Sequence, residues 1–314
     1  MNERTSLILR LVFTHAAPVV ILALLALLIK ADTALLISIT QTTLLIVFFA
    51  GYWEFISKKA KWLFCAFSEL LILAAIWLRV SNPAPQPLSA FWLTALAVVQ
   101  VFLLMELINI LRAIFIRDNE KLEITFPFGP GEYLITDGGN SRISRMMNYH
   151  YHSGPHKKQN TNKSMLYATD IIMFDDKADK FFPQQNSHYA VFGKNVLAPM
   201  DGEVVTAKND INDNTPYSGN YPYNTGNTVV IKKDNYYFLL GHMQKGSIKV
   251  KEGDEVKPGT VIGKAGNSGR TERPHLHIQL MKSDTTKYWS GLGICIVYKG
   301  RNLYKNRSIV IPRQ

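Results

Sequence analysis

Cysteine is almost absent from this chain of 314 residues, which holds only Cys65 and Cys295. Cys65 lies in a long apolar run and Cys295 in the more polar C-terminal part, so we expect no disulfide between them. Two such cysteines do not make a disulfide framework, and they give no information about the redox compartment.

Charged residues are scarce in the first 117 residues, which hold nine Lys/Arg and five Asp/Glu. A membrane-spanning helix needs about 20 apolar residues, and four runs qualify, at roughly 7–29, 34–52, 62–80 and 90–116. The first run is too long, and too soon followed by the second, to be a cleaved signal peptide. We therefore predict a four-helix transmembrane region at 1–117, in contact with membrane lipid, and a soluble domain at 118–314.

Blocks of Lys/Arg interleaved with aromatic residues are also missing, so we expect no nucleic-acid partner. Of the chain's 35 Lys/Arg and 24 Asp/Glu, 26 and 19 remain for residues 118–314, which gives a net charge of about +7. This charge suits an anionic surface, such as lipid headgroups or an acidic polymer. A solvated basic face without a specific partner is the alternative interpretation.

The Lys/Arg residues near the four expected spans are divided unevenly between the two sides of the membrane. One side receives Arg4, Arg10, Lys58, Lys59, Lys61, Arg112, Arg117 and Lys121, and the other receives Lys30 and Arg79. The positive-inside rule then places both termini and the soluble domain in the cytoplasm.

Two carboxylates, Glu69 and Glu106, lie inside the expected spans. Ionisable groups are costly there and usually face the interior of a helix bundle. We favour a role in helix packing, by pairing with Arg112, Gln100 or Asn109 or by protonation. A role in a membrane sensor or transporter is the alternative.

Helical periodicity stops after residue 116, and short apolar or alternating runs take over, separated by Gly, Pro, Asn and Asp. Such runs predict an all-β soluble domain with an antiparallel sheet. A long polar loop, rich in tyrosine, is expected at 209–224 and could form one wall of a substrate groove. The expected strands are 122–126, 132–135, 204–207, 228–232, 236–240, 261–264 and 276–280.

Two segments of the domain, 197–205 and 250–263, resemble the halves of a biotinyl/lipoyl-like hybrid motif. This motif also occurs in carrier domains. No lysine flanked by small residues or Met lies at a hairpin tip, so a carrier function is not expected. We interpret the two segments as an element of the fold.

The tripeptide His275-Leu276-His277 enters an apolar strand pattern. Residues two apart on a strand point to the same face, so both imidazoles should project together while Leu276 enters the core. Neutral imidazole is a good zinc ligand, and a second imidazole can move protons near neutral pH. A His-x-His on a strand is often incidental, so the prediction depends on other groups that complete a site.

Other groups of this kind are present. Asp170 lies in the apolar run 166–172, where an unpaired charge is expensive, and a metal would serve as its partner. A carboxylate that is hydrogen-bonded at a strand end is the alternative. His242 follows an apolar strand. His150, His152 and His156 form a cluster, which could also bind metal adventitiously at the surface.

Several motifs, taken in chain order, resemble the lysostaphin/LytM-type zinc metalloendopeptidases over about residues 120–285. The resemblance implies one Zn²⁺ per chain, held by a histidine, Asp170 and His277, with His242 and His275 as the catalytic pair. The motifs are Asp170, Ala198-Pro199-Met200-Asp201-Gly202, Gly226-Asn227-Thr228-Val229-Val230, Gly241-His242, the glycine-rich segment 250–263, Gly266-Asn267-Ser268-Gly269 and Pro274-His275-Leu276-His277.

The first metal ligand departs from the usual family pattern. That ligand lies four residues before the aspartate, where this chain has Leu166. A subgroup of the family instead reads Gly-Gly, Asn-x-His-Tyr and Tyr-Ala-x-Asp, which favours His150 as the first ligand. His152, expected on the same strand face as His150, and then His156 are the alternatives. The matching residues here are Gly138-Gly139, Asn148-Tyr149-His150-Tyr151 and Tyr167-Ala168-Thr169-Asp170.

The resemblance implies a membrane-anchored enzyme that hydrolyses peptide bonds in peptidoglycan cross-links or stem peptides. A non-catalytic LytM-like module, which binds cell wall or activates another hydrolase, is the alternative. Peptidoglycan lies outside the bacterial inner membrane, so the implied location of the domain is external or periplasmic and conflicts with the Lys/Arg distribution. We favour the external side, because large domains can cross a membrane regardless of local charge.

Overall fold

The structure is a computed structural model of the whole chain. It describes residues 9, 11–28, 34–55, 58–82, 88–115, 119–152, 162–174, 183–219, 221 and 224–313. The chain divides into two compact units, Met1–Arg112 and Ala113–Gln314. The division lies close to residue 117, where the predicted transmembrane region ends and the predicted soluble domain begins.

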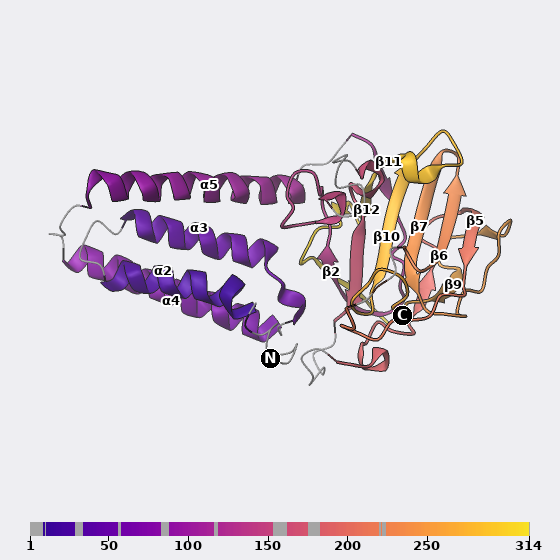
Figure 1. Cartoon of the computed structure of the whole chain (residues 1–314), viewed down its shortest axis with the longest axis horizontal. Helices are drawn as coiled ribbons and strands as arrows, with labels where there is room; N and C mark the ends of the chain where they lie inside the picture. Colours follow the sequence, from indigo (N-terminus) through magenta and orange to yellow (C-terminus); the bar gives the residue numbers. More distant parts are fainter. Residues whose placement is uncertain are drawn as a thin grey trace. The chain divides into compact units, whose positions relative to one another are not determined.

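The first unit is helical in its described residues (Figure 1). Two helices, at residues 59–81 and 90–115, are long and apolar enough to cross a membrane by length and composition, whereas Val12–Leu28 and Ala34–Ala50 are apolar but shorter. The four-span interpretation therefore stays a prediction. The helices are α2 (Ala17–Leu28, preceded by a π-helical turn at Val12–Ala16), α3 (Ala34–Ala50), α4 (Lys58–Ser81) and α5 (Ala90–Phe115).

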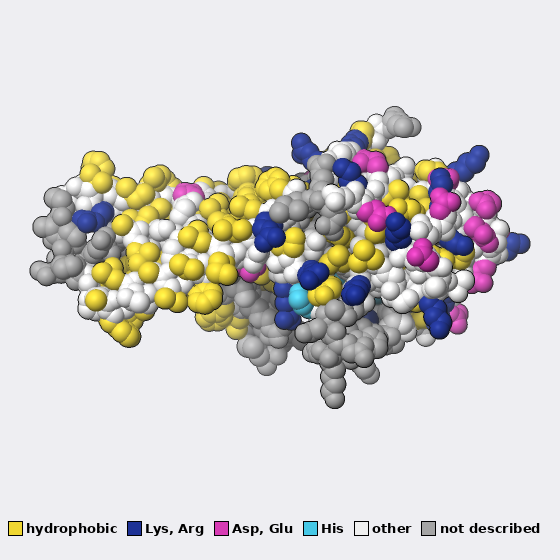
Figure 2. Space-filling view, turned by 90° about the horizontal axis from the view of Figure 1, so that it is seen from above, with side chains coloured by type: hydrophobic (Ala, Val, Ile, Leu, Met, Phe, Trp, Pro, Cys, Tyr) yellow, Lys and Arg dark blue, Asp and Glu magenta, His cyan; other side chains and the backbone are white. Residues whose placement is uncertain are grey.

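The helical unit turns large apolar side chains outward and keeps polar contacts inside. Trp62, Trp77 and Phe102 are more than half exposed, and Figure 2 shows apolar side chains spread over the visible face of this unit. Between the helices, the Gln41 amide donates to Glu69 at 3.0 Å. Gln41 is thus a partner of Glu69 that is not among the partners predicted for the two carboxylates.

The second unit is built on a nine-stranded sheet, counted over the described residues. Its order is β14-β2-β3-β10-β7-β6-β5-β8, with β11 paired to β10, and every pairing in it is antiparallel, as predicted. Of the seven expected strands, five lie in it, and 122–126 and 261–264 lie in other sheets. The strands are β2 (Gly131–Asp137), β3 (Thr169–Met173), β5 (Gly202–Lys208), β6 (Asn227–Lys233), β7 (Tyr236–Met243), β8 (Glu255–Val256), β10 (Leu276–Lys282), β11 (Leu292–Gly293) and β14 (Ser308–Ile311).

Two smaller sheets complete the described part of this unit. The pair β4 (Asn195–Leu197) and β9 (Val261–Lys264) is antiparallel, and with the β5–β8 pair it brings the two halves of the suspected hybrid motif together. Its biotinyl/lipoyl-like character stays a prediction. The expectation of antiparallel pairing is wrong for β1 (Lys121–Glu123), which runs parallel to β12 (Cys295–Tyr298). The third strand of this sheet, β13 (Arg301–Asn302), pairs with β12 in the antiparallel direction.

The central strand β10 separates a core face from a site face. Leu276, Ile278 and Leu280 are buried in the main hydrophobic core. The residues between them, His277 and Gln279, point to the opposite face, as the period of two requires. Burial of the three aliphatic side chains fixes the register of β10, and a slip of one residue would turn both polar side chains into the core.

Candidate metal and catalytic site

Strand register brings three predicted residues together. The strand β10 lies between β3 and β7, and His277 is directly opposite Asp170 on one side and Gly241 on the other. His242 is therefore one residue away from the position opposite His277. Residues that are 35 to 107 positions apart in the sequence thus meet on one face of the sheet.

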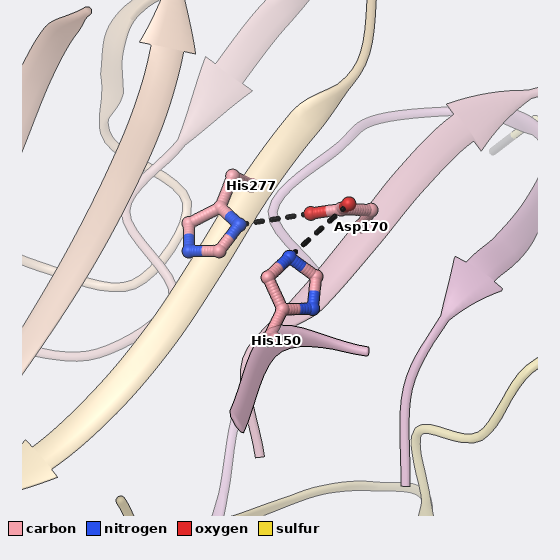
Figure 3. A group of neighbouring side chains, drawn as sticks. All are labelled: His150, Asp170 and His277. Atoms are coloured by element: carbon pink, nitrogen blue, oxygen red, sulfur yellow. Dashed lines mark hydrogen bonds and ion pairs between the residues drawn. The ribbon is translucent and has the colours of Figure 1, made fainter. Parts of the chain in front are cut away.

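His150, Asp170 and His277 form a buried group whose ligand atoms all lie within 4.8 Å of one another (Figure 3). His150 reaches it from a 3₁₀ turn, His150–His152. Its Nε2 lies 3.3 Å from Asp170 Oδ2, and His277 Nδ1 lies 2.8 Å from Asp170 Oδ1. This is the group with metal-ligand character among the described residues, and two imidazoles with one carboxylate suit zinc.

The outer hydrogen bonds of both imidazoles orient their inner nitrogens towards the site. His150 Nδ1 lies 2.7 Å from the side-chain oxygen of Asn148, and His277 Nε2 lies 3.4 Å from that of Gln279. An amide oxygen only accepts, so each of these ring nitrogens carries the hydrogen. The lone pairs of His150 Nε2 and His277 Nδ1 then face Asp170, and a proton or a cation must lie between such atoms and the carboxylate.

The two remaining predicted histidines stand beside this group. The rings of His242 and His275 are 4.8 Å apart, and His275 Nε2 lies 3.5 Å from Asp170 Oδ1. His242 donates from Nδ1 to the carbonyl of Ser268 at 2.7 Å, and His275 donates from Nδ1 to that of Arg273 at 2.9 Å. Each ring therefore keeps an Nε2 lone pair that can take a proton.

The backbone at His242 is unusual. Its φ of 58° lies in the left-handed region, which side chains other than glycine seldom adopt. Its N–H donates to the carbonyl of Thr225 at 2.7 Å, and this bond helps to hold the conformation. Backbone strain of this kind gathers at functional sites, and here it holds the imidazole beside His275.

The charges of the site favour a bound cation. Burial raises the pKa of the Asp170 carboxyl, but the neighbouring charges of His150 and His275 outweigh it and hold this pKa well below its usual range. Burial, followed by the charges of His275 and His277, lowers the pKa of His242 well below its usual value. Burial likewise lowers the pKa of His277, although Asp170 opposes it. The site thus keeps one anionic oxygen donor, and burial favours the neutral form of two of its imidazoles, His242 and His277.

The structure separates the three candidates for the first ligand. His150 joins Asp170 and His277, whereas His152 turns its Nε2 to the carbonyl of Ser141 at 3.1 Å. His156 lies outside the described residues. The expectation that 150 and 152 share a strand face is wrong, because this segment forms a 3₁₀ turn. Leu166, at the usual ligand position, packs against Tyr167, Cys295 and Val297 instead.

The described part of the 209–224 loop is tied to the segment that leads into His275. Asn214 donates from its amide to the carbonyl of Gly269 at 2.7 Å, and the N–H of Tyr217 donates to that of Glu272 at 2.9 Å. The loop therefore lies beside the site, and its role as a groove wall stays a prediction.

Sequence reasoning assigned no role to Asn148 and Gln279, which contact the outer nitrogens of two site imidazoles. A usable signal exists for Gln279: it stands two residues after His277 on the same strand face, where a polar residue needs a partner. Ser268 and Arg273 act through main-chain carbonyls, which leave no signal in the side-chain pattern.

Residues 187–288 match the model of Peptidase family M23. This part of the chain is an M23 peptidase domain. It includes His242, His275 and His277 but begins after His150 and Asp170, whose assignment rests on the geometry above and on the resemblance. M23 peptidases are zinc metallopeptidases, which agrees with the chemistry of the described ligands.

Two curated relatives are similar to about a third of the chain. The chain is 36% identical over 100 residues to the peptidoglycan DD-endopeptidase ShyA of Vibrio cholerae. The matched region makes up 32% of this chain and 20% of the relative. The chain is also 33% identical over 100 residues to the glycyl-glycine endopeptidase ALE-1 of Staphylococcus capitis. This matched region makes up 30% of this chain and 25% of the relative. The matched part thus spans a quarter or less of these relatives.

A solved structure similar to the chain is the catalytic domain of lysostaphin from Staphylococcus simulans. It is 24% identical, and the match covers 38% of this chain and 69% of that one, with a TM-score of 0.25.

Proposed function

We propose that this chain is a membrane-anchored zinc metalloendopeptidase that hydrolyses peptide bonds in peptidoglycan cross-links or stem peptides. The observation that carries the proposal is the convergence of His150, Asp170 and His277 within 4.8 Å, with His242 and His275 beside them. The two matched relatives named as endopeptidases support the reaction class, and the one named for peptidoglycan supports the substrate.

The donor set fits zinc. Catalytic zinc sites use three protein ligands and leave a fourth position open. Two ligand atoms of a tetrahedral zinc site lie roughly 3.3 Å apart when each is about 2.0–2.1 Å from the metal. The 3.3 Å between His150 Nε2 and Asp170 Oδ2 matches that spacing. Zinc, when bound, lowers the pKa of water to about 7 and polarises a carbonyl.

The chain's own residues then supply binding and proton transfer. Asp170 supplies the negative charge, and the two ligand imidazoles supply oriented lone pairs. His242 and His275 stand together with their Nε2 atoms available, so one can take the proton of the attacking water and the other can give a proton to the leaving amine. Either imidazole suits either role.

The membrane anchor is also part of the proposal. The outward Trp and Phe side chains of α4 and α5 form the kind of apolar surface that lipid tails cover. We place the peptidase domain on the external side of the bacterial inner membrane, where its substrate lies. A reporter fused to the C-terminus, active on only one side of the membrane, tests this orientation; a cytoplasmic C-terminus would exclude peptidoglycan as the substrate.

The catalytic part is tested with His275→Ala in the full chain, purified in detergent. We expect about one zinc per chain to be retained and turnover of purified peptidoglycan to fall by about 10²–10⁴-fold, the usual contribution of positioned acid–base catalysis. His188→Ala, an exposed histidine outside the site, is the matched control. Undiminished activity in His275→Ala contradicts the mechanism, and a chain without zinc whose site variants still function in cells favours the non-catalytic module.

A further inference from the structure

Asn148 is a fully buried residue with a carboxamide in contact with three segments of the site. Its Oδ1 accepts from the main-chain N–H of His150 at 3.1 Å and faces the Nδ1 of the same residue at 2.7 Å. Its Nδ2 donates to the carbonyls of Gly139 at 2.9 Å and Ala168 at 2.8 Å. One side chain thus joins the three motif pieces that stand far apart in the sequence.

The contacts of Asn148 leave its amide only one orientation. A carboxamide has two N–H donors and one oxygen with two lone pairs, and all four positions are used here. The carbonyls of Gly139 and Ala168 can only accept, so Nδ2 must face them and Oδ1 must face His150. Gly139, with a φ of 89°, makes the turn that presents its carbonyl.

The fixed orientation of Asn148 determines the state of the first predicted ligand. Because Oδ1 accepts, His150 carries its hydrogen on Nδ1 and keeps the lone pair on Nε2, which lies 3.3 Å from Asp170. Tyr149 stacks on the ring at 4.7 Å, and His277 lies on another side at 4.9 Å. A flipped ring would turn the protonated nitrogen towards the metal position.

The bond to Ala168 has a second consequence. Ala168 stands two residues before Asp170, at the entry to β3, so Asn148 links the turn that carries His150 to the strand that carries the second ligand. A histidine four residues before the aspartate would be tied to it by local backbone, but Leu166 occupies that position. A short 3₁₀ turn gives no such directional constraint by itself.

We infer that Asn148 is a positioning residue of the metal site, which fixes the tautomer of His150 and its place relative to Asp170. This inference rests on the proposed zinc-dependent function. Loss of an outer partner of a ligand histidine typically weakens metal binding by about 10–100-fold.

The test uses the full chain in detergent and has two readouts that need no substrate. Competition with a chromophoric chelator gives the zinc dissociation constant. ¹⁵N imidazole shifts of the metal-free protein, recorded at a pH where His150 is neutral, give the tautomer of His150. We expect Asn148→Leu to weaken zinc binding by about 10–100-fold. Asn148→Asp, which keeps the acceptor, should preserve the Nδ1–H tautomer and bind zinc more tightly than Asn148→Leu.

Asn302→Leu is the matched control, because it removes another buried carboxamide, from β13. It should lower stability and leave the zinc dissociation constant unchanged. An unsubstituted chain that binds no zinc overturns the proposed function and the inference with it. Wild-type zinc affinity in a folded Asn148→Leu overturns the inference alone. Where that variant does not fold, an Nε2–H tautomer of His150 in the unsubstituted protein overturns it, and an Nδ1–H tautomer supports it.

Discussion

The two units of this chain place polar and apolar groups in opposite ways. In the β unit, aliphatic side chains of β6, β7 and β10 fill the core, and charged side chains such as Lys251 and Lys257 are exposed. In the helical unit, Trp62, Trp77 and Phe102 stand outside, and polar side chains meet between helices. Each arrangement lowers free energy only in its own solvent, water for the first and lipid for the second.

Buried polar groups also serve different purposes in the two units. In the helical unit they bridge neighbouring helices: Gln100 donates to Ser38 and Thr42, each at 3.0 Å. In the β unit they converge from separate strands and a turn on Asp170. The first pattern ties helices together, whereas the second concentrates donor atoms in one place, which is what metal binding requires.

The largest effect is expected from removing Asp170, the carboxylate on which the buried polar groups of the β unit converge. Asp170→Ala removes the anionic donor and leaves His150 and His277 without their shared partner, so we expect loss of zinc and of peptidoglycan hydrolysis below detection. Elemental analysis and a turbidity assay on purified cell wall measure both. Asp284→Ala, at an exposed carboxylate, should change neither. Retained stoichiometric zinc in Asp170→Ala would show that the metal binds elsewhere.

The next effect tests whether the outside of the helical unit faces lipid. Phe102→Arg places a charge in the middle of α5 on an exposed face, at a cost to insertion of about 2.5–3.5 kcal/mol near the bilayer centre. The membrane-bound fraction should fall, whereas Phe102→Leu should leave it unchanged. Improved solubility of the arginine variant without loss of membrane attachment would contradict a lipid-facing α5.

An intermediate effect is expected from pH, which should change the zinc affinity of the site. Burial lowers the pKa of His150, but the charge of Asp170 outweighs it, and the net pKa is raised above its usual 6.5. Below the raised value a proton competes with zinc for this nitrogen, so zinc affinity should drop roughly tenfold per pH unit. Calorimetry in buffers of different protonation enthalpy counts the protons released, and none released near pH 6.5 would contradict the assignment of His150.

The metal-free protein should respond to pH in the opposite direction. Because the folded-state pKa of His150 is raised, protonated His150 beside Asp170 contributes stability that is fully present below pH 6.5. This contribution is lost as pH rises through the raised value. Zinc therefore stabilises the folded domain most at the pH where the proton has left.

The smallest effect is expected from removing a polar side chain that bridges two helices. Gln100→Leu removes two hydrogen bonds between α5 and α3, a loss of about 0.6–2 kcal/mol for polar contacts in membranes. Denaturant unfolding of the helical signal in detergent should shift, while zinc affinity stays unchanged. A change in zinc affinity would show that the two units are energetically coupled.

Much of the site follows from local pattern. The period of two predicts that His275 and His277 share a face, and the apolar surroundings of Asp170 predict a partner for its charge. The strand register that joins them depends on burial of Leu276, Ile278 and Leu280, which the alternation also predicts.

The rest depends on contacts distant in sequence. The parallel pairing of β1 with β12 joins residues 121 and 295, and no local pattern encodes it. The 3₁₀ turn at His150–His152 is held by Asn148, whose partners lie in two other segments. In the helical unit, α3 ends at Ala50 rather than at residue 52, because the N–H of Tyr52 donates to His15 Nε2 at 2.6 Å instead of to its own helix.

The carboxamide of Asn148 has a consequence for how related sequences are sorted. Leu166 stands where the usual ligand is expected, and by that criterion alone this chain would be grouped with members that have lost their metal. The Gly-Gly, Asn-x-His and Tyr-Ala-x-Asp pieces are better scored as one indivisible unit, since a single side chain touches all three. An inactive member is then one that lacks the unit, not one that lacks a histidine at a single position.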